Sequence, residues 1–184
     1  TKNYGVPQSR KRFTLVANRV TEDKLEPIEL QDKVLTVRDV LGVENGFPKI
    51  PAGYQDGSDY MHSCAGLSEI NLQRLKLIPK DGGNRSAFAD CPDLQLKCFI
   101  GKDDSFKDTF GRLWWDRPAP TITTKFFSIS NGRFVHPEED RALSLREGAT
   151  LQSFPKTYVF KTNSRDKIAR LIGNAVPPKY AEQI

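Results

Sequence analysis

The sequence predicts a mixed α/β fold with a small, irregular, β-rich region in its middle. Three observations support this prediction. Residues 12–17 form a short apolar run that favours a strand. Residues 144–174 carry two patterns typical of helix starts. Residues 49–113 are rich in Gly, Pro, Asp, Asn and Ser, which indicates irregular loops and short strands between the two ends.

The first predicted element is the strand over residues 12–17, which follows a loop marked by Gly5 and Pro7. Because this run is continuously apolar, we expect the strand to be buried. The basic residues 10–12, taken alone, are typical of a solvated turn. A polar connector over residues 21–27 follows the strand.

Two short helices are predicted next. Thr36 can cap a helix of one to two turns that ends at Gly42. Further on, residues 71–78 place leucines at helical spacing, and Pro79 ends that helix.

A Gly-Gly turn with a basic tip follows over residues 80–85. The residues leave two interpretations open, a surface loop or a loop that reads DNA. The second interpretation rests on Gly83, which lets the backbone approach a groove or a phosphate closely. It rests also on Asn84 and Arg85, which supply donors for base edges.

Residues 106–135 predict an extended segment and then a hairpin. Two prolines spaced two apart force an extended path, which Thr121 and Ile122 continue as β structure. The side chains of Trp114 and Trp115 are more typical of a core or a packing lid than of base stacking. An Asn-Gly pair near the end of this range predicts the hairpin turn.

Two capped helices are predicted at the end of the chain. Ser144 and Glu147 form a capping box, so a helix begins at Leu145 and is stopped by Pro155. On this helix we expect the side chains of Arg146 and Glu147 to be free to make polar contacts.

The second helix starts after Ser164, which can cap it, and carries Ile168, Leu171 and Ile172. Gly173 is well placed as the left-handed residue that ends this helix.

The composition bounds the function only loosely. The net charge of +5 and a pI near 9.1 are compatible with a polyanionic partner. The sequence has no apolar run of about eighteen residues that could span a membrane, so we expect a soluble intracellular protein with no membrane partner. Three cysteines at no disulfide-like spacing indicate free thiols in a reducing compartment.

The three cysteines, Cys64, Cys91 and Cys98, could form a four-ligand metal site with His62. Zinc sites usually show more closely spaced cysteine pairs, so we favour partly buried thiols and predict no metal. None of the cysteines is expected to act as a nucleophile. His136 beside a proline is expected to be structural.

Three motifs resemble conserved blocks of the cytosine-5 DNA methyltransferases. REGATLQSFP (residues 146–155) and IGNAVPP (residues 172–178) are similar to the last two blocks of that family. YGVPQSRKR (residues 4–12) resembles the preceding block, whose core is Gln-x-Arg-x-Arg. The motifs occur in the family's order with a long variable stretch after the first, which makes the signal specific. The resemblance extends over the whole chain, as the C-terminal portion of a bacterial-type enzyme.

This resemblance implies a doubly wound α/β methyltransferase domain with an inserted target recognition domain, and DNA in the cleft between them. Residues 1–29 would be a returning strand and connector of the catalytic domain. Residues 30–135 would form the target recognition domain, and residues 136–184 the C-terminal helices of the catalytic domain.

The resemblance also implies catalytic residues. Gln8, Arg10 and Arg12 stand at matching positions of the first block. Arg12 matches the residue that hydrogen-bonds the exocyclic oxygen of the flipped cytosine, and Arg10 lies on the adjoining structural and phosphate side. A guanidinium suits this role because it stays charged while negative charge develops on the ring.

The remaining implied sites hold the cofactor and the DNA. The pocket for the cofactor S-adenosyl-L-methionine would be lined by Asn174, Gly173 and Ala175. The contacts with double-stranded DNA would come from Gly83, Asn84, Arg85, Arg112, Thr121 and Ile122.

The family's glycine-rich cofactor loop, its Pro-Cys nucleophile and its catalytic Glu are missing from this sequence. We therefore expect this chain to be inactive alone and to require the missing N-terminal catalytic half. Two alternatives remain, a separately encoded recognition subunit and a non-catalytic DNA-binding module. The resemblance further implies a monomer in the bacterial cytoplasm, associated with the nucleoid, that takes part in restriction-modification.

Overall fold

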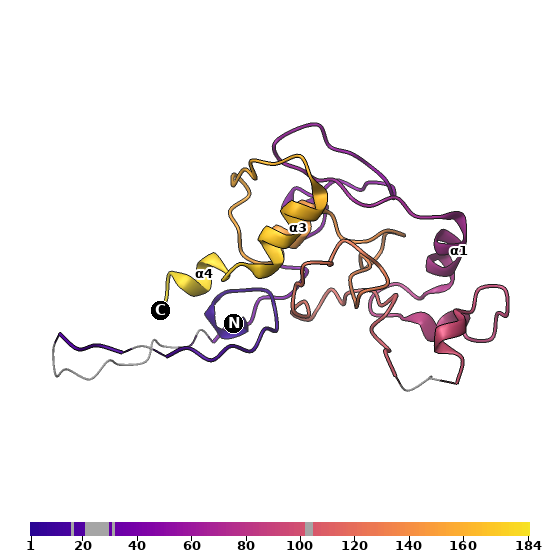
Figure 1. Cartoon of the computed structure of the whole chain (residues 1–184), viewed down its shortest axis with the longest axis horizontal. Helices are drawn as coiled ribbons and strands as arrows, with labels where there is room; N and C mark the ends of the chain where they lie inside the picture. The colour runs from indigo at the N-terminus through magenta and orange to yellow at the C-terminus, as the bar shows by residue number, and fades with distance from the viewer. Residues whose placement is uncertain (16, 21–29, 31, 102–104) are drawn as a thin grey trace.

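The computed structural model describes residues 1–15, 17–20, 30, 32–101 and 105–184. Short helices are separated by long loops (Figure 1). The α-helices are α1 (Glu69–Leu77), α2 (Leu145–Leu151), α3 (Arg165–Asn174) and α4 (Pro178–Ala181). The 3-10 turns are η1 (Lys2–Tyr4), η2 (Val43–Asn45), η3 (Arg85–Phe88) and η4 (Lys97–Phe99). None of these helices is long and apolar enough to cross a bilayer.

Throughout the described ranges, β structure is limited to isolated bridges. They join Gln8 to Ala119, Arg112 to Val135, and Val135 to Ala142. The strands and the hairpin predicted for the middle of the chain are therefore not found there. Backbone hydrogen bonds between loops and within turns hold this region, and buried arginine side chains add further bonds to loop carbonyl groups such as those of Ile78 and Gly82.

The buried strand predicted over residues 12–17 is wrong. Phe13 and Leu15 are 89% and 79% exposed, and residues 12–15 have no assigned strand. A buried strand needs a neighbouring strand to bond with, and no described segment pairs with this backbone. Val16 of this prediction and the connector at residues 21–27 lie outside the described residues.

The larger hydrophobic core is built on α2 and α3. Leu145, Ala149 and Leu151 of α2 and Ile168 and Ile172 of α3 are buried in it. The loops before α2 contribute Val37, Leu41, Phe47, Leu113, Trp115, Ala119, Ile122, Phe126, Phe127, Phe134 and Leu143. The core thus includes residues from both sides of the predicted domain boundary after residue 135, and that boundary stays a prediction.

A smaller core holds α1 in place. Leu75 of α1 and Ile78 after it are buried with Phe88, Phe110 and Val135. The helix predicted over residues 71–78 is confirmed by α1, which begins slightly earlier. This smaller core belongs to the loop-rich middle of the chain.

The turn after Thr36 is not the capped helix that we predicted. The carboxylate of Asp39 accepts hydrogen bonds from both the N–H and the hydroxyl of Thr36, at 2.8 and 2.9 Å. The N–H of Leu41 donates to the carbonyl of Val37, which makes one turn that does not continue. Val37 and Leu41 are buried in this turn although it does not form a helix.

The helix after Ser144 is confirmed as α2, together with its capping box. The Ser144 hydroxyl accepts from the N–H of Glu147, and the Glu147 carboxylate accepts from the N–H of Ser144. The expectation that Arg146 and Glu147 are free is wrong, because both side chains are buried. Arg146 donates instead to loop carbonyls such as that of Tyr60.

The helix after Ser164 is confirmed as α3, and Ser164 caps it. Gly173 does not end this helix in a left-handed conformation, because α3 continues to Asn174 and Ala175 is the cap. A Cβ at Gly173 would lie 2.5 Å from the carbonyl carbon of Thr123. Gly173 is therefore needed for close packing of α3 on this loop.

The two ends of the chain lie side by side (Figure 1). The rings of Tyr4 and Tyr180 meet edge to face with centroids 5.0 Å apart. The amide of Gln183 donates to the carbonyl of Tyr4 at 3.3 Å. The first motif is thus brought next to the last one.

Candidate functional site

The three motifs meet at the side chain of Gln8. Gln8 is fully buried, and its Oε1 accepts a hydrogen bond from the N–H of Ile122 at 2.7 Å. Its Nε2 donates to Oε1 of Gln152 at 2.7 Å, and Nε2 of Gln152 donates to the carbonyl of Ile172 at 2.7 Å. One chain of amide hydrogen bonds therefore ties the first motif to the loop at Ile122, to the end of α2 and to α3.

Arg10 also holds the motifs together. Its Nη1 donates to the carbonyl of Ile122 at 3.2 Å and to that of Gly173 at 3.1 Å. Burial, and then the neighbouring charge of Arg12, lower the pKa of Arg10, although a guanidinium remains charged in proteins. Arg10 thus bonds the first motif to residues 122 and 173, and its catalytic role stays a prediction. We name the set Gln8, Arg10, Ile122 and Gln152 the motif junction.

Arg12 lies just outside the motif junction. Its side chain is exposed, and Nη1 donates to the adjacent carbonyl of Lys11 at 2.7 Å. The Thr121 hydroxyl donates to the carbonyl of Ser9 at 3.3 Å, and Ile122 is fully buried. The structure therefore gives Thr121 and Ile122 a role in holding the first motif, and Arg12 is accessible to a ligand.

Asn174 and Ala175 line a surface groove of about 840 Å³. The remaining lining includes the aromatic Tyr158 and the basic side chains of Lys167 and Arg170. Gly173 is absent from the lining and packs instead against residues 123–124. Of the three predicted cofactor residues, two thus face a groove and the third positions the helix.

The predicted basic tip of the Gly-Gly turn is wrong, because Arg85 is buried. Its guanidinium lies 4.4 Å from the centroid of the Phe99 ring, and Nη2 donates to the carbonyl of Ser105 at 2.5 Å. Asn84 caps η3, since its side chain accepts from the N–H of Ser86. These side chains are used to shape the loop, whereas Gly83 is partly exposed.

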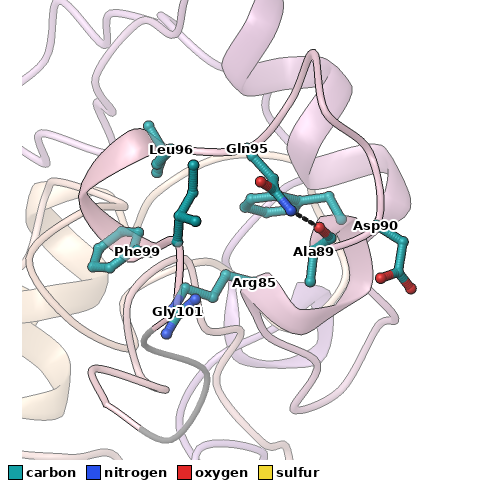
Figure 2. Close-up of a pocket in the computed structure, with 9 residues that line it drawn as sticks. Arg85, Ala89, Asp90, Gln95, Leu96, Phe99 and Gly101 are labelled. Atoms are coloured by element: carbon teal, nitrogen blue, oxygen red, sulfur yellow. Dashed lines mark hydrogen bonds between the residues drawn. The ribbon is translucent and has the colours of Figure 1, made fainter.

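Arg85 also lines a small pocket of about 180 Å³ (Figure 2). The pocket lies between η3 and η4. Gln95 on its rim donates to the carbonyl of Ala89. The side chains of Gln95 and Arg85 are thus already hydrogen-bonded within the loop. The pocket is a feature of the loop's packing.

Arg112 is fully buried, so the surface position expected of a DNA contact is wrong for it. Its guanidinium donates to four carbonyl groups and to the carboxylate of Asp140. The carbonyls belong to Leu75, Ile78, His136 and Glu139, at 2.8 to 3.2 Å. Arg112 joins α1 to the loop that precedes α2.

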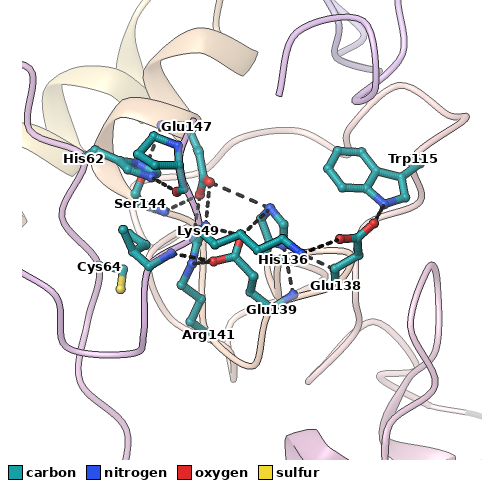
Figure 3. Close-up of polar contacts among 12 residues, drawn as sticks. Lys49, His62, Cys64, Trp115, His136, Glu138, Glu139, Arg141, Ser144 and Glu147 are labelled. Atoms are coloured by element: carbon teal, nitrogen blue, oxygen red, sulfur yellow. Dashed lines mark hydrogen bonds and ion pairs between the residues drawn. The ribbon is translucent and has the colours of Figure 1, made fainter. Parts of the chain in front are cut away.

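The structure contains a buried polar cluster at the start of α2 that we did not predict from the sequence (Figure 3). Nη1 and Nη2 of Arg141 donate to both carboxylate oxygens of Glu147 at 2.7 and 2.8 Å. Arg141 also pairs with Glu139, and His136 lies 3.3 Å from that carboxylate. The only signal in the sequence was the run of charged residues at 138–141 before the helix, to which we assigned no role.

Burial alone would raise the pKa of Glu147, but the charge and hydrogen bonds of Arg141 outweigh it and lower the pKa to about 2. The same carboxylate raises the pKa of Arg141. Burial lowers the pKa of His136, so its imidazole is neutral at pH 7. The cluster is thus an ionised pair beside a neutral histidine.

His62 and Cys64 belong to the packing around this cluster. Nδ1 of His62 lies 2.9 Å from the Ser144 hydroxyl. Burial raises the pKa of the Cys64 thiol, which disfavours a nucleophilic thiolate. In the part of the chain that the structure describes, no group of three or more His, Cys, Asp or Glu residues could hold a metal ion.

The family model for C-5 cytosine-specific DNA methylase matches residues 1–184. The chain is 39% identical to the type II methylase M.HgiDII of Herpetosiphon aurantiacus, over 95% of this chain and 49% of the relative. It is 30% identical to the type II methyltransferase M1.BsuMI of Bacillus subtilis, over 98% of this chain and 40% of the relative. It is 36% identical to DNA (cytosine-5)-methyltransferase 3 of Arabidopsis thaliana, over 80% of this chain and 12% of the relative. The chain thus spans half or less of the length of these relatives.

Proposed function

Because this chain belongs to the C-5 cytosine-specific DNA methylase family, we propose that it is the C-terminal, DNA-recognising part of a DNA (cytosine-5)-methyltransferase. Its partners are then double-stranded DNA and an N-terminal catalytic half, which completes a doubly wound α/β domain. The lengths of the relatives support this proposal, since the chain covers 49% of one and 40% of another.

The motif junction is the observation that carries this proposal. Gln8 and Arg10 bond directly to Ile122, which lies in the proposed target recognition domain (residues 30–135). The first motif and this part of the proposed domain are therefore held as one unit. Arg12 lies two residues after Arg10, which is held by hydrogen bonds, and the side chain of Arg12 is exposed. There it can hold the exocyclic oxygen of a flipped cytosine while negative charge develops on the ring.

In the proposed reaction, the other half of the protein supplies a thiolate that attacks C6 of the cytosine. C5 becomes nucleophilic enough to accept a methyl group. Loss of the C5 proton then expels the thiolate from C6, which restores the C5–C6 double bond and frees the nucleophile. S-adenosyl-L-methionine supplies the methyl group when bound. The residues of this chain position the DNA and stabilise charge on the base.

The groove beside Asn174 fits one edge of that cofactor. Asn174 offers an exposed amide, Ala175 leaves room beside it, and Lys167 and Arg170 complement a carboxylate. The lining residues of the groove include no carboxylate that could hold a ribose or a sulfonium. We therefore assign Asn174 and Ala175 to one wall of the cofactor site and the remaining contacts to the N-terminal half.

A chimera tests the proposal. This chain replaces the matching part of M.HgiDII, and methylated cytosines are mapped by bisulfite sequencing of plasmid DNA from cells that express it. We expect methylation from the chimera and none from the 184-residue chain alone. A folded chimera that leaves the plasmid unmethylated, or methylation by the chain alone, contradicts the proposal.

A further inference from the structure

Trp114 lies between two arginine side chains. The guanidinium carbon of Arg133 is 3.9 Å from the centroid of the indole ring, and that of Arg117 is 4.5 Å from it. Arg133 is buried whereas Arg117 is exposed. We name these three residues the arginine stack; its inner end is Arg133 and its outer end is Arg117.

The inner end of the stack is fixed by hydrogen bonds. Nη1 of Arg133 donates to the carbonyls of Gly82 and Arg112, both at 2.8 Å, and Nε donates to Asp108 at 2.8 Å. Gly82 also packs against the indole so closely that a Cβ there would lie 1.9 Å from Nε1 of Trp114. The ring is therefore held rigidly beside the Gly-Gly turn.

The outer end of the stack is available to a ligand. The carboxylate next to Arg117 in sequence, Asp116, is paired with Arg38 at 2.7 Å. Within the described ranges, the guanidinium of Arg117 has no hydrogen bond or ion pair, and it lies over the Trp114 ring. The backbone at this position is anchored, because the carbonyl of Arg117 accepts from the N–H of Val37 at 3.0 Å.

A guanidinium that stacks on an aromatic face keeps the N–H groups at its edge free, in a planar fork that matches a two-oxygen acceptor. Because the ring already restricts the arginine side chain, that side chain loses less conformational entropy on binding. An exposed cation without a counterion, pre-organised on a rigid support, is suited to a polyanion.

We propose that Arg117 is a DNA contact and that Trp114 and Arg133 are its positioning residues. This proposal rests on the proposed function and adds a residue to the recognition surface. The acceptor is a bidentate partner on DNA, either two oxygens of a backbone phosphate or the O6 and N7 edge of a guanine.

The experiment measures binding of the 184-residue chain to two labelled duplexes by fluorescence anisotropy, one of mixed sequence and one of A·T pairs only, at several salt concentrations. Arg117→Ala is compared with Arg165→Ala. Arg165 is a matched control because it is an exposed arginine that also lies over an aromatic ring, 5.3 Å from the centroid of Phe127. Circular dichroism checks that each variant is folded.

We expect Arg117→Ala to weaken binding by about tenfold or more, and Arg165→Ala to bind like the parent. Arg117→Lys should restore only part of the affinity, because it keeps the charge and loses the planar fork. A phosphate contact weakens binding to both duplexes and reduces the salt slope by about one. A guanine contact weakens binding only to the duplex that contains guanine.

Equal affinities of Arg117→Ala, Arg165→Ala and the parent on both duplexes would overturn the inference while leaving the proposed function intact. A parent chain that binds neither duplex would contradict the DNA-recognising role itself and the inference with it.

Discussion

Replacing Glu147 by glutamine should show how much the buried ion pair stabilises the fold. Glu147 is fully buried, pairs with Arg141 through both oxygens and caps α2. Its pKa falls on folding from an ordinary 4.5 to about 2, a difference that corresponds to about 3 kcal/mol of unfolding free energy. Glu147→Gln keeps the shape and the acceptor oxygen of the side chain but removes the charge.

The expected loss depends on pH. Because the pKa of Glu147 is lowered in the folded protein, its contribution is fully present above pH 4.5 and is lost as the pH falls towards 2. At pH 7 the glutamine variant should therefore unfold with a free energy about 3 kcal/mol lower than the parent. The difference between the two proteins should shrink steadily below pH 4.5.

Urea unfolding followed by circular dichroism measures both free energies at a series of pH values. Asp166→Asn is the control, since it removes an exposed carboxylate that pairs with Lys125 at 2.8 Å. This variant should be close to the parent throughout. If Glu147→Gln were equally destabilising at pH 7 and pH 3, the loss would arise from altered helix capping and the reasoning from charge would be refuted.

Three further predictions follow from the site. Gly173→Ala should lower the thermal unfolding midpoint by several degrees, because its Cβ would lie 2.5 Å from Thr123, whereas Gly57→Ala, with open space around it, should not. The 184-residue chain should bind duplex DNA weakly, and its affinity should fall steeply with salt in a two-concentration titration; affinity independent of salt would contradict this. In the complete enzyme, Arg12→Ala should lower turnover far more than DNA affinity, as measured by single-turnover kinetics and binding; equal losses would indicate a structural role.

Local patterns in the sequence predicted the starts of α2 and α3 correctly. The capping box of Ser144 and Glu147 and the cap at Ser164 depend on residues three apart, and both are confirmed. The strand at residues 12–17 failed because a strand depends on partners that a local pattern does not contain. The apolar run indicated a tendency to form a strand, and no segment among the described residues pairs with it.

The roles of buried arginines could not be predicted from local patterns. Arg85 and Arg112 were assigned to DNA from the resemblance to the family, and Arg85 also because its donors suit base edges. In the structure their partners are mostly carbonyl groups on segments remote in sequence, which have no side-chain signature. Gly173 was misinterpreted for a similar reason, since the backbone that it packs against lies fifty residues earlier, at Thr123.

The way Arg112 holds its loops affects how freely this region can change. Its guanidinium binds the carbonyl groups of Leu75, Ile78, His136 and Glu139, and every amino acid carries a carbonyl group. Exposed positions along these loops can therefore mutate without losing their attachment to the framework. A region supported through its backbone can acquire a new surface while its shape persists.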